Sequence, residues 1–255
     1  MRGVAAGLVF GSLLSLPVLP ATPIYAAEPA VTLATRVSWT ARLVELSAGI
    51  DQEPKRVGLY SERGDLYFFL GDFAKSVQDY DRMVELDPQQ DASHWRRGIA
   101  YFYADDFAKA AGQFERYHSF DQVDRENGIW RYLSQLKAHG QKVAREGLLK
   151  YEKDDREPFP DVYRLFAGTI EPAAIVDRIE KASVSDDERE KRRFYAELYI
   201  GLNEAVEGRD AEARAHLAKA VANTWGRKAG YGPHYMWQVG RLHLELLEKK
   251  AKSGG

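Results

Sequence analysis

The chain has 255 residues, no cysteine and a balanced charge, since 36 basic and 38 acidic residues give a formal net charge of −2. This length suits one or two domains, and a hydrophobic content of 45% is enough for a packed core. The lack of cysteine excludes disulfides, thiolate nucleophiles, cysteine-based zinc sites and a lipid anchor on an N-terminal cysteine. Balanced charge argues against a dedicated nucleic-acid binder, which normally carries a basic domain or stripe.

Residues 1–26 have the three parts of a secretory signal peptide. Arg2 precedes a long apolar run, and small residues end the segment at Ala26 and Ala27. We therefore expect cleavage after Ala26 or Ala27 and a periplasmic or otherwise exported protein. An uncleaved membrane anchor is the alternative, although the run barely reaches the roughly 20 apolar residues that span a bilayer. No later segment is apolar enough to cross a membrane.

Residues 27–56 form an N-terminal segment that includes a predicted helix. Val37–Ile50 has apolar residues at helical spacing. We expect this helix to cap the elements that follow.

Residues 57–124 contain an internal repeat with a period of 34 residues. The pairs at this spacing are Gly64 and Gly98, Tyr67 and Tyr101, Phe73 and Phe107, Ala74 and Ala108, and Tyr80 and Phe114. This period is the signature of the tetratricopeptide repeat, a helix–turn–helix unit. Glycine at the matched positions lets the two helices approach closely, and Pro88 ends the second helix of the first unit. The second unit departs from the pattern at its end, where Gln122 replaces the proline.

Residues 193–223 form a further repeat of this type, in which Gly201 matches Gly64 and Gly208 matches Gly71. Residues 125–192 have the length for two more units but a poor pattern. One helix face is predicted by Trp130, Tyr132, Leu133 and Leu136, and a second by Val143, Leu148 and Tyr151. Short helices are expected on either side of Gly168, with Pro172 near a helix start.

Residues 224–255 are predicted to form a glycine-rich loop, a capping helix at about Pro233–Lys249 and a basic tail. The fold class that these elements predict is all-α. More finely, it is a tetratricopeptide-type solenoid of helical hairpins with degenerate middle repeats and capping helices at both ends.

Three stretches carry a more specific resemblance. They are HWRRGIAYFYADDFAKAAGQFERY, IWRYLSQLKAHGQKVAREGLLKY with EPFPDVYRLFAGTIEP behind it, and RRFYAELYIGLNEAVEGRDAEARAHLAKAVAN. Their order and spacing resemble the NlpI family of periplasmic tetratricopeptide lipoproteins of Gram-negative bacteria. The resemblance implies a homodimeric periplasmic adaptor that docks a processing protease and cell-wall enzymes and catalyses nothing itself. The lipid-bearing cysteine of that family is missing here, so a lipid anchor is not implied.

The sequence contains no pattern that points to catalysis, a metal or a cofactor. Its six histidines include no pair at the i, i+4 spacing of a helical zinc site, and no serine, threonine or lysine lies in a nucleophile motif. The glycine-rich stretch 229–233 is interpreted as a turn between helices. Asp186, Asp187 and Glu188 are interpreted as the acidic start of a helix, where carboxylates are stabilised by the helix dipole.

In the tetratricopeptide family, fixed positions of the first helix of each unit face a concave groove. The residues at these positions that we predict to bind a partner are Phe68, Phe69, Trp95, Ile99, Phe102, Tyr103, Tyr195 and Leu198. Such an aromatic surface suits a peptide or a second subunit, because buried aromatic side chains dominate protein interfaces. A carboxylate clamp is not expected, since Ile99 and Leu202 occupy positions that need polar donors. The alternative is that the irregular centre or a terminal helix covers these side chains.

These observations predict an exported, non-catalytic scaffold that mediates protein–protein interactions in the cell envelope. One alternative is a ligand-binding or enzymatic module in residues 154–182. The side chains that would line its pocket are Asp154, Asp155, Arg156, Asp161, Tyr163 and Arg164. Another alternative is self-assembly through the C-terminal helix.

Overall fold

The computed structural model describes residues 31–153 and 155–253, and within these ranges it contains thirteen α-helices, one 3₁₀ turn and no strand. The all-α class is therefore confirmed. The elements are α1 (Leu33–Gln52), α2 (Val57–Leu70), α3 (Phe73–Leu86), η1 (Pro88–Gln90), α4 (Trp95–Tyr103), α5 (Phe107–Phe120), α6 (Arg125–His139), α7 (Gln141–Glu146), α8 (Phe159–Phe166), α9 (Pro172–Lys181), α10 (Asp186–Val206), α11 (Asp210–Ala222), α12 (Thr224–Lys228) and α13 (Tyr231–Ser253). The expected signal peptide lies outside the described residues. Among the helices described, none has the length and apolarity needed to span a bilayer.

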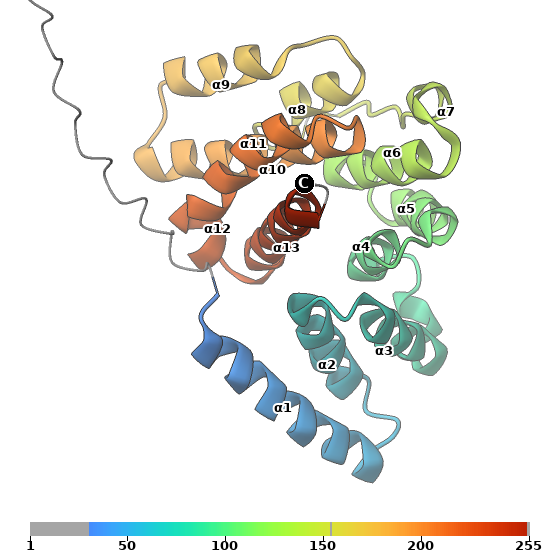
Figure 1. The fold of residues 1–255 in the computed structure, drawn as a ribbon. Coiled ribbons are helices and arrows are strands. Elements are labelled where there is room, and N and C mark those ends of the chain that lie inside the picture. Colours follow the sequence, from blue (N-terminus) through green and yellow to red (C-terminus); the bar gives the residue numbers. More distant parts are fainter. Residues whose placement is uncertain (1–30, 154, 254–255) are drawn as a thin grey trace, which may run out of the picture.

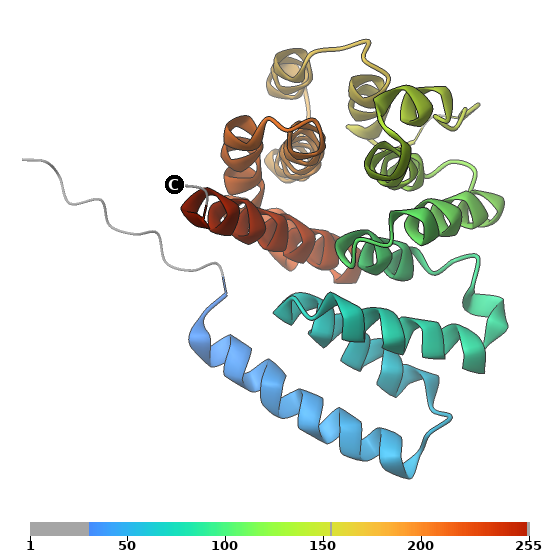
Figure 2. The ribbon, with the colours of Figure 1, turned by 45° about the vertical axis from the view of Figure 1, so that its right-hand side comes forward.

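Helices α1 to α12 follow one another along an arc, and α13 runs through its interior (Figure 1). The same arrangement is visible from a second direction (Figure 2). Extensive packing joins α2 to α3, α4 to α5, and α10 to α11, each pair being consecutive in the chain. The protein is therefore built largely from helical hairpins arranged around its last helix.

Four turns between consecutive helices share one backbone conformation. Each has a residue with positive φ: Gly71 at 85°, Asp105 at 61°, Gly168 at 72° and Gly208 at 82°. At the first turn, the Gly71 N–H donates to the Phe68 carbonyl and the next N–H donates to the Tyr67 carbonyl, both at 2.9 Å. The other three turns repeat both hydrogen bonds. These bonds satisfy carbonyl groups that a helix end otherwise leaves without partners.

A second feature recurs inside three of the hairpins, where a glycine contacts a large side chain of the partner helix. An added Cβ would lie 2.7 Å from Tyr80 at Gly64, 2.6 Å from Phe114 at Gly98 and 2.7 Å from Leu217 at Gly201. Only glycine permits these approaches without a shift of the facing side chain or of the helix. The glycine spacing seen in the sequence thus has a direct structural cause.

The central region differs in part from the prediction. Helix α7 ends at Glu146, so the expected continuation through Leu148 and Tyr151 is not helical. The Tyr151 ring instead packs edge-on against Tyr163, with centroids 5.2 Å apart, and its side chain anchors a non-helical segment. The helices around Gly168 are α8 and α9, and Pro172 is the first residue of α9, as expected.

The C-terminal region also extends the prediction. Helix α10 begins at Asp186, where the Ser185 side chain accepts from the Glu188 N–H, so the acidic helix start is confirmed. Part of the expected loop forms α12, and α13 begins at Tyr231, which places Pro233 in its first turn. Proline is tolerated there because N–H groups of the first turn have no intrahelical acceptor.

Helix α13 is held inside the arc by contacts with the first and last hairpins. The Tyr235 ring stacks on Phe68 with centroids 5.0 Å apart, and the Trp237 indole donates to the Val221 carbonyl at 2.9 Å. The buried Arg241 guanidinium donates to the Phe69 carbonyl at 2.6 Å. The apolar face of α13 is therefore used within this chain, including Trp237, Val239 and Leu242.

Candidate functional site

The structure buries most of the residues predicted to line an open groove. Those with at most 9% of their surface exposed are Phe68, Phe69, Ile99, Phe102, Tyr103, Tyr195 and Leu198, and Trp95 is half-buried. Helix α13 covers several of them: Tyr235 contacts Phe68 and Phe69, and the Tyr103 hydroxyl lies 2.9 Å from Nδ1 of His243. The sequence left open whether these side chains line an open groove or are covered by another part of the chain. The structure shows several of them covered by the C-terminal helix.

A polar cluster, buried at Asp65 and Tyr80 and open to solvent at Tyr231, fixes the start of α13 to the first two hairpins. The Asp65 carboxylate accepts from the Tyr80 hydroxyl, the Tyr231 hydroxyl and the Arg96 guanidinium, each at 2.6 Å. Burial is the main cause that raises the pKa of Tyr80 and Tyr231, so both phenols stay protonated. The inner face is thus occupied by α13 near α2.

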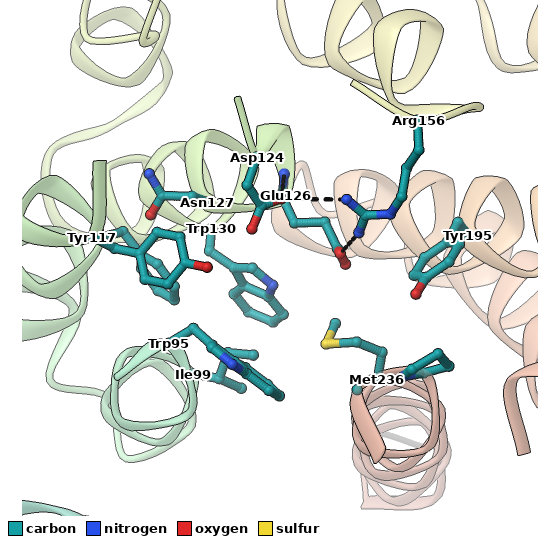
Figure 3. Close-up of a pocket in the computed structure, with 13 residues that line it drawn as sticks. Trp95, Ile99, Tyr117, Asp124, Glu126, Asn127, Trp130, Arg156, Tyr195 and Met236 are labelled. Atoms are coloured by element: carbon teal, nitrogen blue, oxygen red, sulfur yellow. Dashed lines mark hydrogen bonds and ion pairs between the residues drawn. The ribbon is translucent and has the colours of Figure 1, made fainter. Parts of the chain in front are cut away.

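A hollow of about 240 Å³ remains further along the same face, where α4, α6, α10 and α13 converge (Figure 3). We call it the inner pocket. Its lining is Trp95, Ile99, Phe114, Tyr117, Asp124, Glu126, Asn127, Trp130, Arg156, Tyr195, Gly232, Pro233 and Met236. In Figure 3 the side chains of Trp95, Glu126 and Met236 face a common space from α4, α6 and α13, and Arg156 reaches it from the segment before α8.

Aromatic rings form the base and sides of the inner pocket. Trp130 is stacked parallel to Phe114, with centroids 6.1 Å apart, and both are nearly fully buried. Trp95 extends from the first turn of α4 and packs edge-on against Tyr235. These rings are held by core packing, so the walls are formed in the absence of any ligand.

One rim of the inner pocket is a cluster of carboxylates around Arg156. The guanidinium donates to Glu126 and to Asp155, and lies 3.7 Å from Oδ1 of Asp124. It also lies over the Phe159 ring, 4.3 Å from its centroid. The second oxygen of Glu126 accepts from the Tyr199 hydroxyl.

Local structure explains how the acidic side chains reach this rim. Asp124 caps α6, and its carboxylate accepts from the Glu126 N–H at 3.0 Å. Asp155 accepts from the Arg125 N–H at 3.0 Å, which ties the segment before α8 to the start of α6. The tie brings Arg156 over carboxylates that lie thirty positions earlier in the chain.

Burial shifts the pKa of both carboxyl groups on α6 upward. It raises the pKa of Glu126 to about 7, although the Arg156 charge opposes the shift, and Asp124 and Asp155 add to it. Burial likewise raises the pKa of Asp124. The charge of Arg156 therefore does not outweigh the effect of burial on these two carboxyl groups.

The inner pocket also contains a buried donor without an acceptor. The Trp130 side chain is 2% exposed, and its indole Nε1–H has no hydrogen-bond partner. In Figure 3 the nitrogen-bearing edge of this indole faces the space between Glu126 and Met236. An unpaired buried N–H of this kind costs about 1–3 kcal/mol, so the site favours a molecule that can accept from it.

Sequence reasoning found some of these residues and missed others. Trp95, Ile99 and Tyr195 belong to the predicted groove, and Arg156 to the predicted central pocket. The predicted central pocket does not form as one site, because Asp161 pairs with Arg164 and Arg178, and Tyr163 donates to the Leu149 carbonyl. Asp154, another of its predicted residues, lies outside the described residues. The lining residues that the sequence did not suggest as part of a site include Asp124, Glu126, Trp130 and Met236.

Other hollows of the described residues are larger than the inner pocket but less specific, and the largest volume among them is between α9, α10 and α11. About 500 Å³ lies between α9, α10 and α11, but the charges that line it are paired with one another. Arg193 pairs with Glu180 and Glu190, and Lys219 with Glu197. Within residues 31–153 and 155–253, no group of three potential metal ligands is arranged to hold an ion.

A scan against models of known protein families finds no match for this chain, and a search of curated proteins finds none either.

Proposed function

We propose that this protein is an exported, non-catalytic scaffold of the bacterial cell envelope that brings other proteins together. Its hairpins are of the tetratricopeptide type, with α2–α3, α4–α5 and α10–α11 as the clear units. The observation that carries the proposal is the recurrence of one turn and one glycine contact in all three hairpins. Repeats built in this way present long concave surfaces, and such surfaces suit protein segments.

The inner pocket is the place where we expect a partner segment to bind. It lies on the inner face of the arc, and its aromatic walls are formed before any ligand arrives. Rigid aromatic side chains supply much of the binding energy at protein interfaces. Where α13 covers the inner face, the same kind of surface already binds a helix of this chain.

Site-specific photo-crosslinking tests this proposal. Gly232 lines the inner pocket, and an added Cβ would meet nothing within 4 Å, so a benzoylphenylalanine can replace it. Gly58 is a matched control, because it is equally open, exposed and distant from the pocket lining. Irradiation in envelope extract should give protein adducts from position 232 that unlabelled protein competes away. Equal adducts from both positions, or none under several growth conditions, would contradict the proposal.

One observation favours a second candidate, a ligand-binding or enzymatic module. A carboxyl group with a pKa of about 7 inside a pocket has the properties of a general acid or base, and Glu126 is such a group. Native mass spectrometry of the protein purified from its own envelope would distinguish the two functions. A stoichiometric small molecule that disappears in a Trp130→Phe variant would support the second.

A further inference from the structure

We propose that the inner pocket binds the cationic side chain of a lysine or arginine in a segment of a partner protein, and that a backbone carbonyl of this segment accepts from Trp130. This inference rests on the proposed function and adds the chemistry by which a partner is recognised. Three independent features carry it: the size and walls of the pocket, its charge, and the unpaired Nε1–H of Trp130.

The size of the inner pocket suits one long side chain. Its volume of about 240 Å³ lies below the roughly 300–1,000 Å³ of sites that hold drug-sized ligands and cofactors. Trp95, Trp130 and Tyr195 present aromatic surface to this space. Such rings pack well against a methylene stem, and their faces attract a cation by about 0.5–2 kcal/mol in other proteins.

The charge of the rim selects a cation over an anion. Three carboxyl groups, those of Asp124, Glu126 and Asp155, lie around the guanidinium of Arg156. Arg156 is already engaged with them and with the Phe159 ring, so it offers little to an incoming anion. A second cation beside Asp124 would compensate charge that Arg156 leaves uncompensated.

The unpaired donor adds a requirement that an amine alone does not meet. Trp130 Nε1–H is buried, lies on the edge of the indole that faces Glu126 in Figure 3, and needs an acceptor. A peptide carbonyl is such an acceptor, and in a peptide it stands a few bonds from the basic side chain. A basic residue within a chain therefore offers a cation to the carboxyl groups of the rim and a carbonyl to Trp130, whereas a free amine offers only the cation.

The titration behaviour of the rim agrees with this geometry. Burial raises the pKa of Glu126 to about 7 and also raises that of Asp124. A bound cation stabilises the ionised carboxylates, so its binding should lower both pKa values and release protons.

The direct test is a titration of the full exported chain, followed by the NMR signal of the Trp130 indole N–H. The probes are N-acetyl-lysine amide, N-acetyl-arginine amide, the uncharged norleucine analogue, the glutamate analogue and n-butylamine. The two basic amides should bind with dissociation constants of about 1 mM, as expected for fragments of this size. The norleucine amide and n-butylamine should each bind at least tenfold more weakly, because one lacks the cation and the other the carbonyl.

Two variants separate recognition from folding. Asp124→Asn keeps a good cap for α6 but removes a rim charge, and it should weaken the binding of the two basic amides about tenfold. Asp106→Asn is the matched control, since Asp106 caps α5 in the same way and lies outside the pocket lining. It should leave binding unchanged. Thermal unfolding of both variants verifies that they fold.

Each outcome decides the inference without deciding the scaffold function. Equal binding of lysine and norleucine amides, preferential binding of the glutamate amide, or no shift of the Trp130 signal at 20 mM probe would overturn the cationic specificity. Adducts from Gly232 in the crosslinking experiment would then still support a scaffold with a different recognition chemistry. Loss of those adducts with intact lysine binding would instead contradict the scaffold.

Discussion

Tyr235 in the last helix stacks on Phe68 in the first hairpin, with ring centroids 5.0 Å apart and 21° between the ring planes. Both rings are fully buried. The contact joins α13 to the first hairpin inside the arc, so α13 completes the hydrophobic core and is more than a terminal cap. The stability of the first hairpin, α2–α3, should therefore depend on α13, which is far from it in the sequence.

Replacement of Tyr235 by alanine should lower the free energy of unfolding by about 3–5 kcal/mol, because it leaves a cavity among Phe68, Phe69 and Trp95. Urea denaturation measures this change, and amide hydrogen exchange should show loss of protection in α13 and α2 together. Tyr235→Phe is the control, since it keeps the stacking and removes only the hydroxyl 3.3 Å from Tyr80. A loss of protection confined to α13 would contradict the shared core.

Replacement of glycine by alanine should have opposite effects on stability at two positions of α2, Gly64 and Gly58. Gly64→Ala places a Cβ 2.7 Å from the fully buried Tyr80 ring and should destabilise the protein by about 1–3 kcal/mol. Gly58→Ala meets nothing within 4 Å, and should stabilise by about 0.4–1 kcal/mol because alanine restricts the unfolded chain. Thermal or urea unfolding of both variants provides the measurement. Similar effects of the two changes would show that the close approach is not structurally required.

The hairpins could be predicted because their determinants are local and recur. Gly64 and Gly98 mark the close approach, and Gly71 marks a turn that Asp105 repeats with positive φ. The position of α13 could not be predicted in the same way. Its apolar residues, such as Val239 and Leu242, indicate which face is buried, but the same spacing fits a helix that caps the end or one that fills the interior.

The candidate site was only partly predictable for a related reason. Trp95 and Ile99 follow from their positions in a repeat unit, whereas Asp124 and Glu126 have the ordinary sequence of a capped helix start. What makes Glu126 unusual is burial beneath Arg156 and Tyr199, which belong to distant parts of the chain. The shift of a pKa depends on such tertiary neighbours, and a single sequence does not supply them.

His243 should make the protein sensitive to acid. Burial lowers its pKa from 6.5 to about 4, with help from Lys137 and opposition from Asp210. A lowered histidine pKa means that the unfolded chain binds the proton more readily, so stability is complete above pH 6.5 and falls as the pH drops toward 4. When the pH falls from 7 to 5, the free energy of unfolding measured in urea should decrease by about 2 kcal/mol less for His243→Gln than for the parent chain. His139→Gln, a change at an exposed histidine, should follow the parent chain.

Glu126 should act in the opposite direction across the same range. Its pKa is raised from 4.5 to about 7, so between these values the folded protein holds a proton that the unfolded chain has released. Unfolding then becomes easier as the pH rises through this window, and the penalty is complete above pH 7.

Glu126→Gln removes this titration. Between pH 5 and pH 7.5, the free energy of unfolding of the parent chain should fall by about 2–3 kcal/mol more than that of the variant. The comparison depends on the slope with pH and not on the absolute cost of disturbing Arg156, and the histidine contributions cancel because both chains share them. Urea unfolding at the two pH values measures the slope, with Glu115→Gln as an exposed control. Parallel pH profiles for Glu126→Gln and the parent chain would mean that Glu126 is ionised throughout, and the cluster around Arg156 would then be fully compensated.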